Sequence, residues 1–371
     1  MRILEVVSSR VHSGAAAPAL ALARALAGRG HEVTFACLPG GGLERAAGEA
    51  DLALDLSLAL PRGAEVWAYL SDARRLRVLV AGRGLEIVHV HRSSEHTSAF
   101  LAFRRTRPAP LVRTWHRSEP PAGFARWLLG RADAVVTPSA PVHAALGGLG
   151  PRACLVRGGV GLEVFRPDVS SDAVRERHGL AGKIVVGTIS RLKRGRRLES
   201  FLGAAAALAP VRPDLAFAVV GAGELAEALR ARARGLGITG RLVFLDDPNE
   251  SFVERAACID IGVQLAAGSD ASARAGMELA ALGRPVIALE RGALAGLVEH
   301  GVTGCLVKAP HFSSIAQCIS PLVEDPAKRA AMGAAARARA EELFDIRRVA
   351  AEHEALFEEL RDRAAGARGA P

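Results

Sequence analysis

Two acidic residues and an arginine stand four residues apart in the segment SDASARAGMELAALGRPVIAL. Asp270, Arg274 and Glu278 share one face of the helix that this segment predicts, and that face begins beside the end of a strand. Carboxylates in such a place can bind sugar hydroxyls, because an ionised carboxylate accepts paired hydrogen bonds. In the alternative interpretation, Asp270 caps the helix while Arg274 and Glu278 form an ordinary surface ion pair. The spacing alone leaves both interpretations open.

A basic cluster follows another predicted strand, in the segment VVGTISRLKRGRRLESF. Its members are Arg191, Lys193, Arg194, Arg196 and Arg197. These cations surround the predicted start of a helix, where they oppose the helix dipole unless an anion offsets them. A diphosphate would be such an anion, and a solvated basic turn is the alternative.

Three histidines could exchange protons with a ligand near neutral pH. His89 and His91 alternate on one predicted strand, and His116 ends another in VRTWH. Ligands of open α/β sheets bind beyond the carboxyl ends of the strands, which is where His116 falls. A histidine is also common as a purely structural residue, and position alone does not separate the two roles.

Glycine turns form a further group of candidate binding residues. Ser13 and Gly14 follow the first predicted strand and would open a helix whose free amides could hold an anion. Gly221, Gly223 and Gly292 follow later strands and could bring backbone amides to a ligand, or form ordinary turns. The sequence has no Asp-x-Asp motif to hold a metal ion on a diphosphate, so we expect neither a metal nor another cofactor.

The elements that must position these residues follow a β–α rhythm that occurs twice. Short apolar, β-branched runs alternate with alanine-rich helical stretches such as Pro18–Ala27 and Ser98–Arg105. The predicted strands are Ile3–Val7, Val33–Cys37, Ile87–His91, Leu111–His116, Ala134–Pro138, Cys154–Arg157, Ile184–Ile189, Phe217–Val220, Leu242–Leu245, Ile261–Leu265, Pro285–Leu289 and Cys305–Val307. Because these runs lack polar alternation, they are typical of parallel sheets buried on both faces. The sequence therefore predicts an α/β protein with two doubly wound, Rossmann-like domains.

The polar segment FRPDVSSD marks the predicted boundary between the two domains. We expect an N-terminal domain over residues 1–165, a C-terminal domain over 166–344 and a final segment over 345–371. The final segment predicts a helix near Ile346–Arg361 that could pack back on the first domain. The tail AAGARGAP after this helix is expected to fray.

Composition narrows the class of protein. The chain has 371 residues, of which 50% are hydrophobic, and this is enough apolar material to exclude a disordered protein. It has no apolar run of about 18 residues, and MRILEVV leads straight into a strand, so we expect neither a membrane span nor a signal peptide. The five cysteines are odd in number and lack a CxxC pair, which favours reduced thiols in a cytoplasmic protein.

The net charge of +9 is carried mostly by arginine, since only four of the 48 basic residues are lysines. This bias fits either genome composition or selective phosphate binding. Residues 1–165 hold 20 Lys+Arg against 13 Asp+Glu, so we expect the first domain to dock on an anionic membrane, with a scattered solvated face as the alternative. The residues proposed for this contact are Arg74, Arg75, Arg77, Arg104, Arg105, Arg107, Trp67 and Phe103. Scarce aromatic residues and the lack of a recognised module disfavour nucleic acid as a partner.

Over nearly its whole length the sequence resembles the family 4 retaining glycosyltransferases, which have the GT-B fold. The resemblance rests on the order of the segments GRGHEV, HVH, TWH, ADAVVTPS, VRGGVGLEVFRP, ISRLKRGRR, VVGAGE, SDASARAGMELAALGRPVIAL and HGVTGCLV. It implies a hexosyltransferase with a nucleotide-sugar donor in the C-terminal domain and an acceptor in the N-terminal domain. The SDASxR form resembles a subgroup of bacterial surface polysaccharide and lipopolysaccharide assembly. That likeness implies a glycan or lipid-linked acceptor and a peripheral place on the inner face of the cell membrane.

The resemblance also implies roles for individual residues. Arg191 and Arg196 match the two cations that clasp the donor diphosphate in the family, the second with arginine in place of lysine. Asp270 matches the acid near the donor sugar, and Glu278 matches the acid that holds the ribose. His116 matches the histidine of the catalytic region, on the acceptor side. Charge stabilisation of the leaving diphosphate by the two arginines is then the main expected catalytic effect.

The family's glycine-rich first loop matches Ser13-Gly14, and three other places differ from the family pattern. Asp270 stands where glutamate is usual, residues 157–161 replace the usual PNGVD, and residues 292–296 lack the usual acid. These differences keep two alternatives open. One is a catalytically inactive partner subunit that binds a nucleotide sugar, and the other is a sugar-nucleotide epimerase of the same fold.

Overall fold

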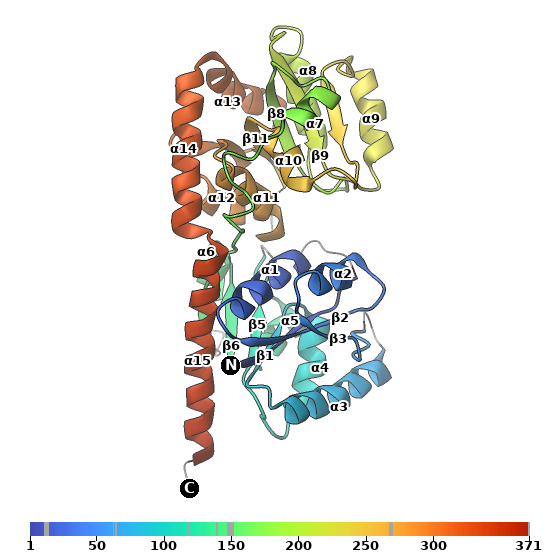
Figure 1. Cartoon of the computed structure of the whole chain (residues 1–371), viewed down its shortest axis with the longest axis vertical. Coiled ribbons are helices and arrows are strands. Elements are labelled where there is room, and N and C mark those ends of the chain that lie inside the picture. Colours follow the sequence, from blue (N-terminus) through green and yellow to red (C-terminus); the bar gives the residue numbers. More distant parts are fainter. Residues whose placement is uncertain are drawn as a thin grey trace. The chain divides into compact units, whose positions relative to one another are not determined.

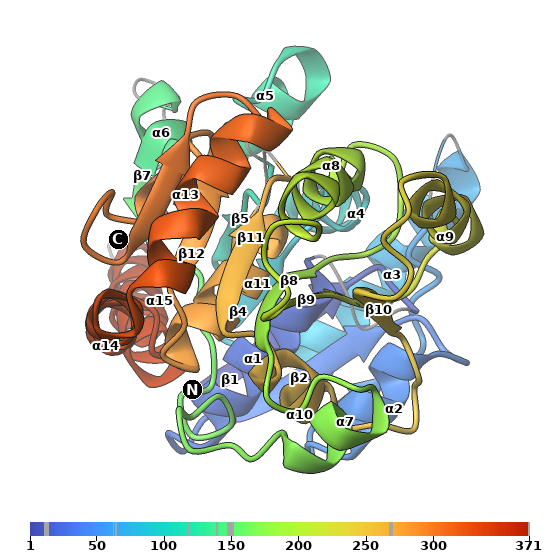
Figure 2. The same cartoon turned by 90° about the horizontal axis from the view of Figure 1, so that it is seen from above.

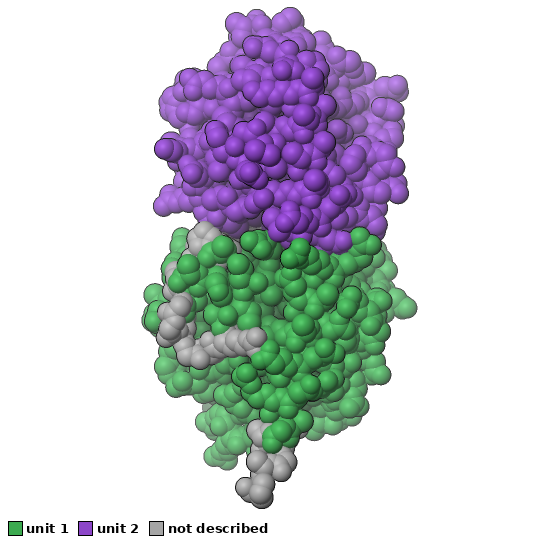
Figure 3. Space-filling view, turned by 90° about the vertical axis from the view of Figure 1, so that its left-hand side faces the viewer, with its two compact units in different colours: residues 1–159, 346–371 green, residues 160–345 purple. Residues whose placement is uncertain are grey.

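The computed structural model describes residues 1–10, 15–61, 63, 65–117, 119–138, 140–146, 152–266 and 270–369. The side chains of residues 141, 145, 152, 270–272 and 367–369 are not part of this description. The chain divides into two compact units, which are coloured separately in Figure 3. Unit 1 comprises Met1–Gly159 and Ile346–Pro371, and unit 2 comprises Val160–Asp345.

Unit 1 is built on a seven-stranded sheet whose neighbouring strands are all parallel (Figure 1). The strands are β1 (Arg2–Val7), β2 (Glu32–Cys37), β3 (Ala53–Asp55), β4 (Ile87–Val90), β5 (Leu111–Thr114), β6 (Ala134–Thr137) and β7 (Arg152–Leu155). The helices are α1 (Ala16–Ala27), α2 (Gly42–Gly48), α3 (Val66–Arg83), α4 (Ser93–Phe103), α5 (Gly123–Leu129), α6 (Ala140–Ala145) and α15 (Ile346–Gly369). The spatial order of the strands is β3-β2-β1-β4-β5-β6-β7.

Helices cover both faces of this sheet, as runs of apolar residues without polar alternation predict. On β1, Ile3 and Val7 pack in the cluster that holds the buried residues of α1 and α15. Leu4 and Val6 point the other way, into the cluster that holds those of α3 and α4. Figure 1 shows the corresponding pairs, α1 beside α15 and α3 beside α4.

Phe103 at the end of α4 corrects one expectation. We predicted this side chain for membrane contact, but it is 5% exposed and packs in the core shared by α3 and α4. The residue lies on the face of α4 that its helical spacing turns toward the sheet, so it is not available to a membrane.

Unit 2 is built on a six-stranded parallel sheet. The strands are β8 (Ile184–Ile189), β9 (Leu215–Val220), β10 (Leu242–Leu245), β11 (Ile261–Gln264), β12 (Val286–Leu289) and β13 (Gly304–Val307). The helices are α7 (Asp172–Arg177), α8 (Leu198–Leu208), α9 (Ala226–Gly235), α10 (Phe252–Ala257), α11 (Asp270–Ala281), α12 (Ala293–Leu297), α13 (Phe312–Glu324) and α14 (Pro326–Leu343). The spatial order is β10-β9-β8-β11-β12-β13, and Figure 2 shows α8 and α13 side by side within this unit.

The structure adds details that the sequence pattern did not predict. β3 is only three residues long and is held by its pairing with β2, so its sequence carries no clear strand pattern. Val160, Leu162 and Phe165 pack in the core of unit 2, which places the boundary between the units before Val160. α15 continues as helix to Gly369, beyond the expected end near Arg361.

Two of the five cysteines are paired. Cys305 on β13 and Cys318 on α13 form a disulfide, with their Cα atoms 6.1 Å apart. The expectation that all cysteines are reduced is therefore wrong for this pair. The turn between strand and helix brings the two residues together, and sequence spacing alone does not reveal that distance. Cys37, Cys154 and Cys258 are free thiols.

Each sheet has a point at which the strand order reverses. In unit 1 this point lies between β1 and β4, and in unit 2 it lies between β8 and β11. Helices leave the sheet in opposite directions from two such strands, which opens a crevice beyond their carboxyl ends. These two crevices are where a doubly wound sheet binds its ligands.

Candidate functional site

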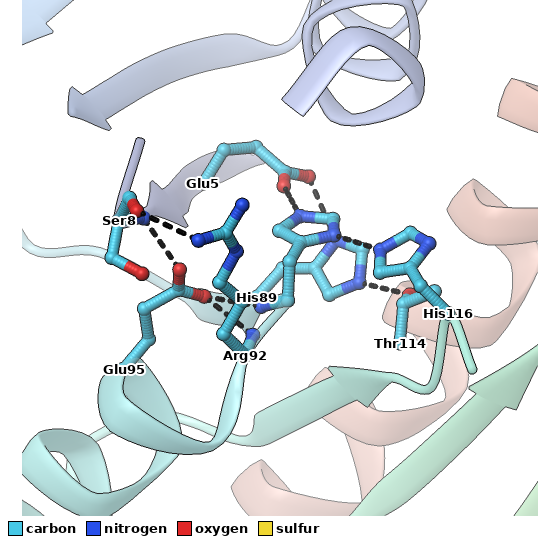
Figure 4. Close-up of polar contacts among 8 residues, drawn as sticks. Glu5, Ser8, His89, Arg92, Glu95, Thr114 and His116 are labelled. Carbon is cyan, nitrogen blue, oxygen red and sulfur yellow. Dashed lines mark hydrogen bonds and ion pairs between the residues drawn. The ribbon is translucent and has the colours of Figure 1, made fainter. Parts of the chain in front are cut away.

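In unit 1, the crevice is bordered by the residues that directly follow β1 and β4. β1 ends at Val7 and is followed by Ser8, while β4 ends at Val90 and is followed by His91. The register pairs Glu5 with His89 across these two strands. Polar side chains on both strands therefore reach the same place in the sheet, and Figure 4 shows them converging.

Glu5 is the centre of this polar group. Its Oε1 lies 2.8 Å from Nδ1 of His89, and its Oε2 lies 2.7 Å from Nε2 of His91. All three residues are buried. Because a carboxylate only accepts hydrogen bonds, both imidazole nitrogens that face Glu5 donate to it. Glu5 therefore fixes the orientation of two rings at once.

The group continues from both imidazoles to the end of β5. His91 Nδ1 lies 2.9 Å from His116 Nε2, and the two rings stack with their centroids 5.2 Å apart. His89 Nε2 lies 2.7 Å from the Thr114 hydroxyl. Glu5 is thus linked to His116 and to Thr114 by two parallel hydrogen-bonded paths (Figure 4).

The electrostatics of the group follow from its burial. Burial opposes the charge of Glu5, but interactions with His89 and His91 outweigh it and lower the pKa of this carboxyl to about 2. Burial lowers the pKa of His91 well below its ordinary value, and the neighbouring His89 adds to this effect. At neutral pH, Glu5 is therefore ionised while His91 is neutral.

Glu5, His89 and His91 also form a set that a divalent metal could use, since their ligand atoms lie within 4.8 Å of one another. In this structure each carboxylate oxygen instead accepts a hydrogen bond from an imidazole. Within this group, both carboxylate oxygens and the imidazole nitrogens that face them are satisfied by hydrogen bonds. We therefore interpret the group as a hydrogen-bonded network.

A second carboxylate holds the backbone around the crevice. Glu95, in the first turn of α4, accepts hydrogen bonds from the amides of Ser8 (2.5 Å), His91 (2.6 Å) and Arg92 (2.8 Å). The Arg92 guanidinium reaches back to the Ser8 carbonyl at 3.2 Å. These contacts tie the ends of β1 and β4 together, so the loops on both sides of the crevice have a fixed spacing (Figure 4).

In unit 2, the basic residues follow β8, at the point where the strand order reverses. Arg191 is exposed, and Arg196 is half-buried just before the N-terminus of α8. Burial and the charge of Arg191 lower the pKa of Arg196. Burial and the charges of both arginines likewise lower the pKa of Lys193. Their mutual repulsion at a helix N-terminus is the electrostatic setting in which a bound anion is stabilising.

The glycines after β9 allow two loops of unit 2 to pack tightly. A Cβ on Gly221 would lie 2.2 Å from the Ser190 carbonyl oxygen, and one on Gly223 would lie 2.4 Å from that of Leu192. The Gly221 amide donates to the Leu245 carbonyl, while Leu192 donates to the Ala222 carbonyl. Both glycines therefore support the loop that carries Arg191.

Gly292 precedes α12 and adopts a φ of +59° with a ψ of −140°. This backbone conformation is essentially restricted to glycine. The residue therefore shapes the turn after β12.

Helix α11 begins at Asp270, directly beyond the end of β11, but the side chain of Asp270 lies outside the described residues. Arg274 Nε donates to Glu278 Oε1 at 2.9 Å. Glu278 is buried, and this burial raises its pKa against the opposing effect of Arg274. The ion pair of the alternative interpretation is therefore present, although it is partly buried because Glu278 lies in the interior.

Some expectations fall outside this description, and two residues were not anticipated. Ser13 and Gly14 lie outside the described residues. Glu5 and Glu95 were missed, because one acid within an apolar strand and one within a helix carry no motif. The pairing of β1 with β4 brings Glu5 to the histidines across more than 80 residues of sequence.

Two family models match nearly the whole chain. Residues 12–164 match the model "Glycosyltransferase Family 4", and residues 170–339 match the model "Glycosyl transferases group 1". The two matches correspond closely to the two halves of the fold described above.

The chain is also similar to two mannosyltransferases and to one solved structure that contains UDP and glucose. A GDP-mannose-dependent alpha-(1-6)-phosphatidylinositol monomannoside mannosyltransferase of Mycolicibacterium smegmatis is 33% identical over 51% of this chain, which spans about half (52%) of that relative's length. The lipopolysaccharide core biosynthesis mannosyltransferase LpcC of Rhizobium leguminosarum is 25% identical, over 76% of this chain and 80% of that protein. The crystal structure of Anabaena Alr3699/HepE with UDP and glucose superposes with a TM-score of 0.82, at 20% identity, over 97% of this chain and 100% of that one.

Proposed function

Because the chain belongs to glycosyltransferase family 4 and has the GT-B fold, we propose that it transfers a hexose from a nucleotide sugar to a glycan or lipid-linked acceptor with retention of configuration. The observation that carries this proposal is the basic cluster after β8, the strand that borders β11 at the crevice of unit 2. The name of the Mycolicibacterium smegmatis relative makes GDP-mannose the first donor to test.

The donor side of the proposal rests on unit 2. Arg191 and Arg196 repel one another where two loops and the N-terminus of α8 meet, and a diphosphate would relieve this repulsion. Negative charge that develops on the leaving diphosphate would be stabilised by the same two guanidinium groups. Glu278 is the proposed ribose contact, and Asp270 is the proposed contact to the donor sugar.

The acceptor side of the proposal rests on unit 1. His116 follows β5, the strand next to β4, and it is a half-buried member of the polar network that Glu5 and His91 form. An imidazole in this place can orient an acceptor hydroxyl by a hydrogen bond. We therefore assign acceptor binding to the crevice of unit 1.

A thermal-shift panel of GDP-, UDP-, ADP- and CMP-sugars tests the donor proposal. A ligand that binds the native chain at 100 times its Kd stabilises it by about 2.7 kcal/mol, so the correct donor raises the melting temperature. Arg191→Ala should abolish that rise, whereas Arg234→Ala, an exposed arginine on α9, should retain it. A rise that is equally large in both variants would contradict the assignment of Arg191.

We also propose that α3 docks unit 1 on an anionic membrane. Trp67 is 84% exposed and Val78 is 74% exposed, and the helical spacing places Leu70 and the exposed Arg74 between them on one face. Aromatic and aliphatic side chains beside arginines are typical of helices that lie in a membrane interface. Such a contact would bring the crevice of unit 1 to a lipid-linked acceptor.

A further inference from the structure

A path of hydrogen bonds leads from the buried Glu5 through His91 to His116. We propose that Glu5 and His91 are positioning residues that hold the ring of His116 and fix its tautomer, with the proton on Nε2 and the lone pair on Nδ1. This inference rests on the proposed function, because His116 is there the residue that meets the acceptor hydroxyl.

The direction of each hydrogen bond follows from the chemistry of its partners. Glu5 is ionised and can only accept, so His91 carries its proton on Nε2 and donates it to Glu5 at 2.7 Å. A neutral His91 then has its lone pair on Nδ1 and accepts from His116 Nε2 at 2.9 Å. His116 must therefore donate from Nε2. In neutral His116 the lone pair is then on Nδ1.

The second path from Glu5 supports the same role. His89 connects Oε1 of Glu5 to the hydroxyl of Thr114, which lies two residues before His116 on the same chain segment. One carboxylate therefore holds the end of β5 at two points. Movement of Thr114 or of His116 breaks a hydrogen bond to a buried imidazole, so the orientation of His116 is strongly constrained.

The burial of the network argues against a purely structural role. Glu5 and His89 are fully buried, His91 is 3% exposed, and only His116 is half-buried. The path thus runs from the interior of the sheet to the carboxyl edge of unit 1. Packing alone would be served by an apolar residue at position 5, since burying an ionised group carries a desolvation cost that a hydrophobic side chain avoids. Glu5, His89 and His91 therefore hold His116, which lies at the carboxyl edge of the sheet.

Two substitutions of His91 separate its two hydrogen bonds. In His91→Gln, the amide reaches the position of Nε2, so it can keep the contact to Glu5 but loses the one to His116. In His91→Asn, the amide oxygen takes the position of Nδ1, so it can still accept from His116 but loses Glu5. If His91 acts by holding His116, His91→Asn should retain more transfer activity than His91→Gln, even where His91→Asn is the less stable variant.

Steady-state transfer and melting temperature should be measured for both variants, in the native background and in His116→Ala. We expect His91→Gln to lower kcat by about 10- to 100-fold, with the KM for the donor unchanged, because misplaced reacting groups cost about this much. In the His116→Ala background, His91→Gln should have no further effect. Equal losses in both backgrounds, or activities that follow the melting temperatures, would overturn the proposal.

Nitrogen-15 NMR of the imidazoles in the full-length chain provides a readout that needs no turnover. In the neutral form of His116, the native protein should show the proton on Nε2 and not on Nδ1, and His91→Gln should show a mixture of tautomers. The opposite tautomer in the native protein would refute the role of Glu5 and His91. One equivalent of bound zinc that is lost in His91→Gln would likewise overturn it in favour of a metal site. A native protein with the expected tautomer but no transfer would instead contradict the proposed function.

Discussion

At the scale of single residues, the crevice of unit 1 depends on two carboxylates with different tasks. Glu5 holds imidazole rings, whereas Glu95 holds the backbone amides of Ser8, His91 and Arg92. Glu5 determines which imidazole atoms face a ligand. Glu95 determines how far apart the loops after β1 and β4 lie. Both are needed for a site that is formed before its ligand arrives.

Replacement of Glu95 by alanine should destabilise the chain markedly. Three backbone amides would lose an ionised acceptor, two of them on buried residues, and each hydrogen bond to a charged group contributes about 1.5–3 kcal/mol. We expect the free energy of unfolding in urea to fall by at least about 3 kcal/mol. Glu44→Ala is the control, because Glu44 accepts from the exposed Gly40 amide and should cost about 1 kcal/mol or less. Equal losses in the two variants would show that Glu95 does not hold the crevice.

The sequence identified some of these residues and missed others for physical reasons. His89 and His91 alternate in an apolar strand and His116 ends another, so each stands out against its neighbours. Glu5 is a single acid whose partners lie more than 80 residues away, and only the order of the strands brings them together. Phe103 was misplaced because a residue at the end of a helix pattern can face either the core or solvent.

At the scale of elements, α3 combines a structural face with an exposed one. Leu76 and Val80 pack in the core, while Trp67, Arg74 and Val78 are exposed. None of the helices formed by the described residues is long and apolar enough to cross a membrane. The exposed face of α3 is the proposed contact with the surface of a bilayer, and each arginine near an anionic surface adds about 1 kcal/mol of attraction.

Sedimentation with vesicles tests this role of α3. The native chain should bind phosphatidylglycerol vesicles more tightly than phosphatidylcholine vesicles, and salt should weaken the binding. Arg74→Ser should lower the affinity for anionic vesicles by about fivefold, which corresponds to about 1 kcal/mol, and Trp67→Ser should lower it as well. Val211→Ser, which changes an exposed apolar residue in unit 2, is the control. Native binding that is no better with anionic lipid would refute the proposal.

At the scale of the whole molecule, two parallel sheets each present their candidate residues at the point where strand order reverses. The apolar strand runs and their repetition predicted both doubly wound units, since buried parallel strands have a distinctive composition. The three-residue β3 and the Cys305–Cys318 disulfide could not be predicted, because both depend on contacts made only in the folded chain. Family resemblance supplied the proposed roles of Arg191 and Arg196, and both residues lie in the loop between β8 and α8.

The most direct test of a nucleotide-sugar transferase is turnover of a confirmed donor by Arg191→Ala and by its control Arg234→Ala. Transfer should be followed by NMR of the product, which also shows whether the anomeric configuration is retained. Arg191→Ala should lower kcat by about 100-fold or more, as expected for the loss of one charge contact to the leaving group, and Arg234→Ala should leave it unchanged. Unchanged turnover in Arg191→Ala, or donor binding by the native chain without transfer, would contradict this account.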